Sequence, residues 1–299
     1  MTEQQELPLT FAEEPKRPER PSSGRRSIDW MAAAALTTGA AKSVDDLLDQ
    51  VASVRDRRLF NALLAVLQYP HASMLCSASE WEAKWGLRIA PGERPLLLMV
   101  PFGPVELVFD VSQTEATERS KRLPFNDSPF GMDPVARAEE AVGRLVADVQ
   151  TIGVRVVDMR QGARLAGHIQ RAGDAGFMLV PARKGRAPAT PVLVRWVVGL
   201  NHRHSATEKL ATLAHELGHL FCGHVGADRG DGWPQRPGLP DVQREFEAES
   251  VARLVFRRVA PDVALPGYLE NLLDPGAPVP DEGWSYVVQA ADRILHLLS

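Results

Sequence analysis

The 299-residue sequence contains two cysteines, Cys76 and Cys222, which lie far apart and belong to no C-x-x-C pair. This shortage excludes a disulfide framework and a cysteine-rich metal site, and it favours a reducing compartment. Long apolar runs are missing as well, since no stretch approaches the roughly 18 residues of a membrane span. We therefore expect a cytoplasmic protein with no membrane partner.

Net charge is also small. The 34 lysines and arginines and 38 acidic residues leave a formal charge of -4, so no global field attracts nucleic acid or an anionic membrane. Partners must therefore be inferred from local sites. Arg25-Arg26 and the alanine-rich residues 32–41 weakly resemble a twin-arginine leader, but Asp29 opens the apolar stretch and disfavours export.

An H-E-x-x-H motif is the most informative stretch, and it occupies residues 215–219. Apolar residues recur around it at helical spacing, and Ser205 and Glu208 form a capping-box pattern before it, so we predict an amphipathic helix. His215 and His219 then lie one turn apart, where both imidazoles can bind one Zn²⁺.

Glu216 follows the first histidine of the motif and is expected to project beside the metal. A carboxylate there can accept a proton from zinc-bound water and pass it to a leaving amine. Two loop histidines before the helix, His202 and His204, are candidates for stabilising an oxyanion, although a loop histidine is more often simply solvated.

A catalytic zinc needs a third protein ligand and one open position. The acidic helix predicted over residues 242–255 offers Glu245, Glu247 and Glu249. Glu245 and Glu249 share a face with two alanines that would allow close approach to the motif helix, whereas Glu247 falls on another face. We predict Glu245 as the third ligand and expect Glu249 to orient a histidine ligand by hydrogen bonding.

Two other residues near the motif compete for the third position. His224 follows His219 by five residues, one short of the H-E-x-x-H-x-x-G-x-x-H spacing, so we expect it to be solvated or to support a ligand. Cys222 lies on the motif helix but faces away from the histidine pair, which favours a buried apolar role.

The two motifs together resemble the ImmA/IrrE family of minimal zinc metallopeptidases. In that family the second motif begins with the ligand glutamate and carries alanines three and seven residues later, a pattern that Glu245, Ala248 and Ala252 match. The resemblance covers residues 133–299. It implies a zinc peptidase with Glu245 as a ligand, and a cytoplasmic repressor or other regulatory protein as substrate.

Patterning and resemblance together predict an α+β fold with a minimal gluzincin-like domain at residues 133–299. Its expected order is a helix, a small mixed sheet, the motif helix and the ligand-glutamate helix. The other expected elements are helices over 134–152 and 284–298 and strands over 154–159, 165–170, 177–181 and 192–200. One strand is expected to border the cleft, where a substrate backbone can add as an extra strand.

The amino-terminal half is predicted to contain a tail, a small domain and a linker. Residues 1–27 are rich in proline, glutamate and arginine and are predicted to be disordered. Residues 28–112 are predicted to form an α+β domain, and the polar residues 113–132 a linker. The expected elements of the domain at residues 28–112 are helices over 30–36, 43–58, 59–67 and 77–86 and a hairpin of strands over 96–101 and 105–111.

This amino-terminal domain resembles the single-stranded-DNA-binding domain of ArdC-type antirestriction proteins. The residues that carry the resemblance are Asn61, Gln68, Pro70, Trp81 and the segment 86–94. In the family this segment is a basic loop, but three of its basic positions are Leu87, Ala90 and Pro91 here. Because phosphate contacts need Lys or Arg, the resemblance implies the fold more directly than it implies DNA binding.

We therefore predict a zinc-dependent endopeptidase that hydrolyses a cytoplasmic, regulatory protein. The alternative is an antirestriction or single-stranded-DNA-binding protein in which the zinc domain is structural or regulatory. A third hypothesis, a protease that needs an activating partner, predicts zinc binding without activity on a generic protein substrate.

Overall fold

The structure of the chain is a computed structural model. It describes residues 23–123, 134–159, 166–173, 176–182, 188–228, 230–236, 238–269, 272–273 and 277–299. Residues 1–22 of the predicted tail and residues 124–132 of the predicted linker lie outside the described residues. The fold class is α+β, as predicted.

Three helices begin the described chain: α1 (Ser23–Thr37), α2 (Val44–Ser53) and α3 (Leu59–Gln68). The side chain of Ser43 accepts a hydrogen bond from the backbone N–H of Asp46 and thereby caps α2. The helix α1 begins at Ser23, inside the tail predicted over residues 1–27. Its residues Ile28, Ala32 and Ala35 are buried in the core and anchor the helix.

A small antiparallel sheet of order β1-β4-β3 follows, built from β1 (Leu75–Cys76), β3 (Leu96–Leu98) and β4 (Glu106–Asp110). The pairing of β3 with β4 confirms the predicted hairpin. Next to it lie α4 (Ala78–Glu80), a π-helical turn (Trp81–Trp85) and a pair of strands, β2 (Leu87–Ile89) and β5 (Thr114–Ala116). The strand β5 lies within the residues predicted as a linker, and the linker as a domain boundary remains a prediction.

Two amide side chains cover the outer edge of β3. Gln68 bonds both the N–H and the carbonyl of Leu97, each at 2.9 Å, and Asn61 does the same for Met99 at 3.0 and 2.9 Å. An uncovered edge would be a template for pairing with another chain. Two of the residues that carry the amino-terminal resemblance therefore serve the local fold.

The carboxy-terminal half contains a mixed sheet of order β6-β10-β7, formed by β6 (Val154–Met159), β7 (Gly167–Arg171) and β10 (Trp196–Asn201). β10 runs parallel to β6 and antiparallel to β7. A separate hairpin pairs β8 (Phe177–Val180) with β9 (Thr190–Leu193). The strand predicted over residues 192–200 is therefore two strands, because the chain changes partners where the N–H of Arg195 donates to the carbonyl of Gly153.

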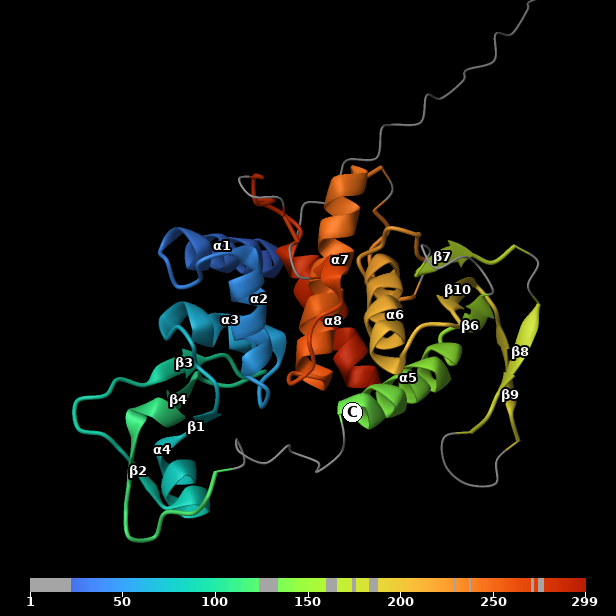
Figure 1. Ribbon diagram of the computed structural model, residues 1–299. Helices are drawn as coiled ribbons and strands as arrows, with labels where there is room; N and C mark the ends of the chain where they lie inside the picture. The colour runs from blue at the N-terminus through green and yellow to red at the C-terminus, as the bar shows by residue number, and fades with distance from the viewer. Residues whose placement is uncertain are drawn as a thin grey trace, which may run out of the picture.

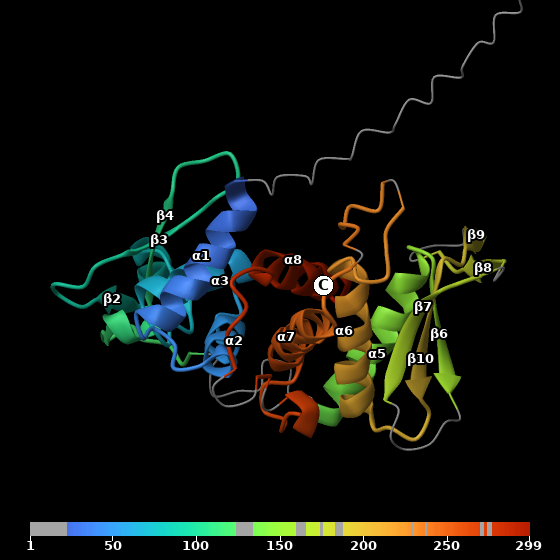
Figure 2. The same cartoon turned by 90° about the horizontal axis from the view of Figure 1, so that it is seen from above.

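Helices stack beside this sheet in layers. α5 (Pro134–Gln150) and α6 (Ala206–Phe221) cover one face of the sheet, and α7 (Asp241–Val259) and α8 (Trp284–Leu297) lie on the other side of α6 (Figures 1 and 2). Short 3₁₀ turns occur at Val111–Gln113 and Gly267–Leu269. The motif helix α6 is thus enclosed between the sheet and the acidic helix α7.

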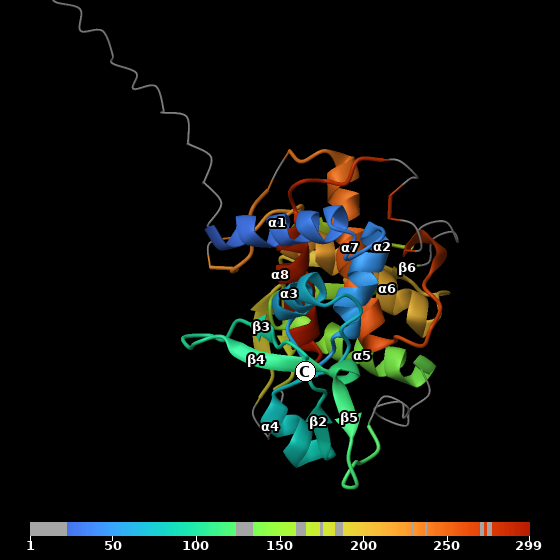
Figure 3. The same cartoon turned by 90° about the vertical axis from the view of Figure 1, so that its left-hand side faces the viewer.

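The amino-terminal helices pack directly on this half of the molecule. One hydrophobic cluster contains Leu47 and Val51 of α2 together with Val255 of α7 and Ile294 of α8, and Figure 3 shows α1, α2 and α3 in front of α7 and α8. The domain boundary near residue 112 remains a prediction. No described helix has the length and apolar character needed to cross a membrane.

Candidate metal centre

The motif helix α6 begins at the predicted capping box. The side chain of Ser205 accepts from the N–H of Glu208, and the Glu208 carboxylate accepts from the N–H of Ser205 at 2.8 Å. Leu210, Leu213 and Leu217 are fully buried along one side of the helix. This packing sets the rotation of α6, so that His215 and His219 face α7.

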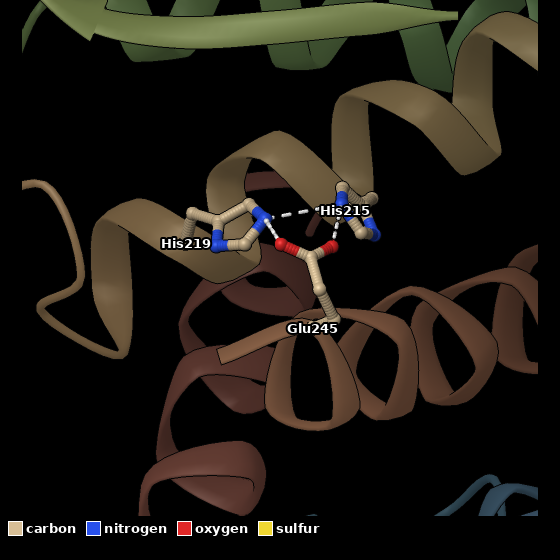
Figure 4. Close-up of side chains that lie close together, drawn as sticks. All are labelled: His215, His219 and Glu245. Atoms are coloured by element: carbon tan, nitrogen blue, oxygen red, sulfur yellow. Dashed lines mark hydrogen bonds and ion pairs between the residues drawn. The ribbon is translucent and has the colours of Figure 1, made fainter. Parts of the chain in front are cut away.

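Three donor groups converge between α6 and α7. The Nε2 atoms of His215 and His219 lie 3.1 Å apart, and the Glu245 carboxylate oxygens lie 3.5 Å from the first and 3.6 Å from the second (Figure 4). Two ligands of one tetrahedral zinc with bonds of about 2.0–2.1 Å lie about 3.3 Å apart. The three separations therefore fit the coordination sphere of a single ion.

Close helix packing brings Glu245 to the histidines. A Cβ added at Gly218 would lie 3.1 Å from the Cα of Ala248, so α6 and α7 cross with almost no space between their backbones. Ala248 and Ala252 are fully buried on the same helix. Small residues at the crossing thus allow the carboxylate, one turn before Ala248, to reach both imidazoles.

The electrostatics of these groups suit a divalent ion. Hydrogen bonds with His215 and His219 hold the pKa of Glu245 well below its usual range. Burial lowers the pKa of His219. Burial acts in the same direction on His215, but the hydrogen bond with Glu245 and the charge of Glu216 outweigh it and raise the pKa of His215. A carboxylate that stays ionised is ready to bind a metal.

Glu216 lies on the sheet side of the histidine pair. It is 6% exposed, and burial raises its pKa to about 7, against a smaller lowering effect from a hydrogen bond with the backbone of Ile169 on β7. A Cβ at Gly167 would come within 3.2 Å of its Oε1 atom, so β7 runs directly past the carboxylate. Glu216 can therefore exchange a proton near neutral pH at the edge of a strand.

Glu249 follows Glu245 by one turn and is partly buried. Burial raises its pKa to about 7, and its charge contributes to the raised pKa of His215. Its role in orienting that histidine remains a prediction.

His202 and His204 lie in the turn between β10 and α6. His202 Nδ1 lies 2.9 Å from the carbonyl oxygen of Met159 at the end of β6. The role of His202 and His204 in stabilising an oxyanion remains a prediction.

A buried pair lies behind the site; the sequence interpretation named support of a ligand as one alternative for His224 but missed its contact with Glu247. His224 and Glu247 are 8% and 0% exposed, and His224 contacts both His219 and Glu247. Gly223, with a φ of 88°, ends the helix in the left-handed region and turns the chain back. That turn brings His224 beside His219, and the glycine that predicted the helix end was the available signal for it.

Comparison with known proteins agrees with the motif. Residues 172–255 match the family model of the IrrE N-terminal-like domain, a peptidase family. No curated protein matches the chain at a significant level. Similar solved structures include the antirestriction protein ArdC from plasmid R388 in metal-free form. The two chains are 14% identical, the match covers 93% of this chain and 96% of that chain, and the TM-score is 0.44.

The Mn(II)-bound structure of the same ArdC protein is also similar, with 14% identity, 92% and 96% coverage and a TM-score of 0.43. ArdC is the protein type that the amino-terminal residues resemble. The family match confirms the resemblance inferred from the two motifs, since His215, Glu216, His219 and Glu245 all lie inside the matched region. Residues 172–255 are therefore similar to the IrrE N-terminal-like domain of a peptidase family.

Proposed function

We propose that this protein is a zinc-dependent endopeptidase. The observation that carries the proposal is the convergence of His215, His219 and Glu245 at spacings that suit one ion, with the buried carboxylate of Glu216 beside them. The peptidase family match supports the same reaction class. Imidazole and carboxylate donors are a common ligand set for catalytic zinc.

The chain supplies the proton transfers and the alignment of the substrate. A bound Zn²⁺ would lower the pKa of a water molecule and polarise the scissile carbonyl. Glu216 would accept the water proton and return it to the leaving amine, a role that suits a buried carboxylate directly after the first histidine of the motif. The edge of β7 beside Glu216 can pair with an extended substrate backbone as an added strand.

The proposed substrate is a cytoplasmic regulatory protein, and this class rests on the resemblance to the ImmA/IrrE family. Binding of single-stranded DNA has less support, because cations in and near the segment expected to contact DNA are already paired with carboxylates. Arg88 pairs with Glu115 at 2.8 Å and Lys84 pairs with Glu80 at 2.6 Å. Cations that are already paired offer less attraction for phosphates, so we do not propose DNA binding.

Metal content and peptide cleavage test the proposal together. We expect about one zinc per chain in the wild type and in Glu216→Gln, measured by mass spectrometry of the metal, and none in Glu245→Ala. On a library of proteome-derived peptides, Glu216→Gln should cleave roughly 10²–10⁴-fold more slowly because the proton acceptor is gone.

Asp241→Asn is the matched control, since this exposed carboxylate begins the same helix α7 and pairs with Arg244. It should keep both zinc and cleavage. A wild-type protein that binds no divalent metal, or a Glu216→Gln variant with full activity, would overturn the proposed mechanism.

A further inference from the structure

A line of buried polar side chains leads from His219 away from the candidate metal centre. His219 Nδ1 lies 2.9 Å from His224 Nδ1, and His224 Nε2 lies 2.9 Å from Oε2 of Glu247. Arg236 completes the line, since its guanidinium donates to both carboxylate oxygens of Glu247, at 2.5 and 2.8 Å. The line is continuous from a surface loop to a proposed metal ligand.

We propose that Glu247 and His224 position His219 for metal binding by fixing its tautomer and ring orientation. This role presupposes the metal site proposed above. It differs from the predicted arrangement, in which Glu249 was expected to orient a histidine ligand.

The donor and acceptor inventory assigns each proton along the line. Glu247 pairs with Arg236, which keeps its proton at any ordinary pH, so the carboxylate only accepts hydrogen bonds. His224 must then carry its proton on Nε2, and its Nδ1 atom becomes an acceptor in the neutral ring. His219 therefore carries its proton on Nδ1, and the lone pair of its Nε2 atom faces His215 and Glu245.

Burial stabilises this arrangement of protons. The side chains of His224 and Glu247 are 1% and 0% exposed, so no bulk water can replace a lost partner, and an unpaired group would be costly. The backbone accommodates Glu247 closely: a Cβ at Gly283, where φ is 111°, would lie 2.6 Å from its Oε1 atom. Arg236 is itself held, with its guanidinium 3.6 Å from the ring centroid of Tyr286.

A second metal site is the competing interpretation, because one donor atom each from Cys222, His224 and Glu247 lie within 4.8 Å of one another. However, both ring nitrogens of His224 and both oxygens of Glu247 already have hydrogen-bond partners. The guanidinium of Arg236 also occupies the place beside Glu247 that a cation would need. The contacts therefore favour positioning over a second ion.

Two variants with a stability control test the role. We expect Glu247→Gln and His224→Phe to weaken Zn²⁺ binding roughly 10–100-fold in competition with a chromophoric chelator. The visible absorption spectrum of the Co²⁺-loaded protein should also change, because the orientation of one ligand is released. Asp45→Asn, which loosens a buried ion pair with Arg253 far along α7, should lower the melting temperature but keep zinc affinity.

The wild-type protein provides a test that needs no variant. Long-range ¹H–¹⁵N correlation spectra of the imidazoles should show the Nδ1–H tautomer for His219 and the Nε2–H tautomer for His224. The reverse tautomer at His224 would overturn the proposal, as would folded variants whose zinc affinity stays within about twofold of wild type. Two bound zinc ions would favour the second metal site, whereas a wild type without metal would refute the proposed function itself.

Discussion

Two glutamates beside the same histidines experience opposite environments. Glu245 is half-exposed and bonds both imidazoles, which holds its pKa low and keeps the carboxylate ionised. Glu216 is enclosed between α6 and β7, where burial raises its pKa to about 7. At the scale of single residues, burial and neighbours thus separate a proposed ligand from a proposed proton carrier.

The raised pKa of Glu216 predicts a pH effect on the stability of the metal-free protein. The folded state binds the Glu216 proton more tightly than the unfolded state, whose reference pKa is 4.5. The stabilising contribution is therefore complete below that value and is lost as the pH rises through about 7. A shift of this size corresponds to roughly 3 kcal/mol.

Urea unfolding in the presence of a chelator measures this effect. Between about pH 5 and pH 8 the free energy of unfolding of the wild type should fall relative to that of Glu216→Gln, which carries no ionisable group there. Both proteins retain Glu249, whose pKa is raised in the same direction, so its contribution cancels in the difference. Parallel pH curves would contradict the burial argument.

At the scale of elements, the crossing of α6 and α7 holds the candidate site together. Each helix brings part of the donor set, and the two backbones meet at Gly218 and Ala248. His215 and Glu245 lie about one turn from this contact, and His219 directly follows Gly218. Any change in the distance between the helices therefore moves Glu245 relative to the histidine pair.

Gly218→Ala should destabilise the protein by about 1–3 kcal/mol, because the added methyl group overpacks the crossing, and it should weaken zinc binding. Gly143→Ala in α5 is the matched control, since nothing lies within 4 Å of a Cβ at that position. There the change should stabilise by about 0.4–1 kcal/mol through helix propensity. Thermal unfolding and zinc competition measure both variants. An unchanged zinc affinity in Gly218→Ala would show that the spacing of the two helices does not control metal binding.

At the scale of the whole molecule, a buried arginine ties the amino-terminal helices to the helix that carries Glu245. Arg253 of α7 is 5% exposed. Its guanidinium pairs with Asp45 at 2.7 Å and with Asp49 at 2.8 Å, both on α2. Together with the shared hydrophobic cluster, this network makes the two halves depend on each other for burial.

This dependence predicts one cooperative unfolding transition in which both halves unfold together. Asp49→Ala should lower the free energy of unfolding by about 1–3 kcal/mol. The loss is smaller than for a fully buried ion pair because Asp49 is partly exposed. Tryptophan fluorescence and far-ultraviolet circular dichroism should give the same midpoint in urea. Two separate transitions would instead support the predicted domain boundary near residue 112 as a real unit of folding.

Much of the fold was predictable because its signals are local. The capping box at Ser205, the stripe of leucines and the valine-rich strand 154–159 each act within a few residues, and all three predictions are confirmed. The choice of Glu245 over Glu247 also depended only on helical periodicity, and the structure places Glu245 beside the histidines. Its role as a ligand stays a prediction.

By itself, the sequence determined the motif helix, the order of the helices and strands around it and the acidic face of α7, because helical and strand periodicity are properties of neighbouring residues. Only the tertiary structure decided that His224 and Glu247 stand behind His219 and that α2 packs on α7. Those contacts depend on the turn at Gly223 and on the helix crossing. The physical reason is that residues distant in the chain meet only when packing sets the distance and rotation of whole elements.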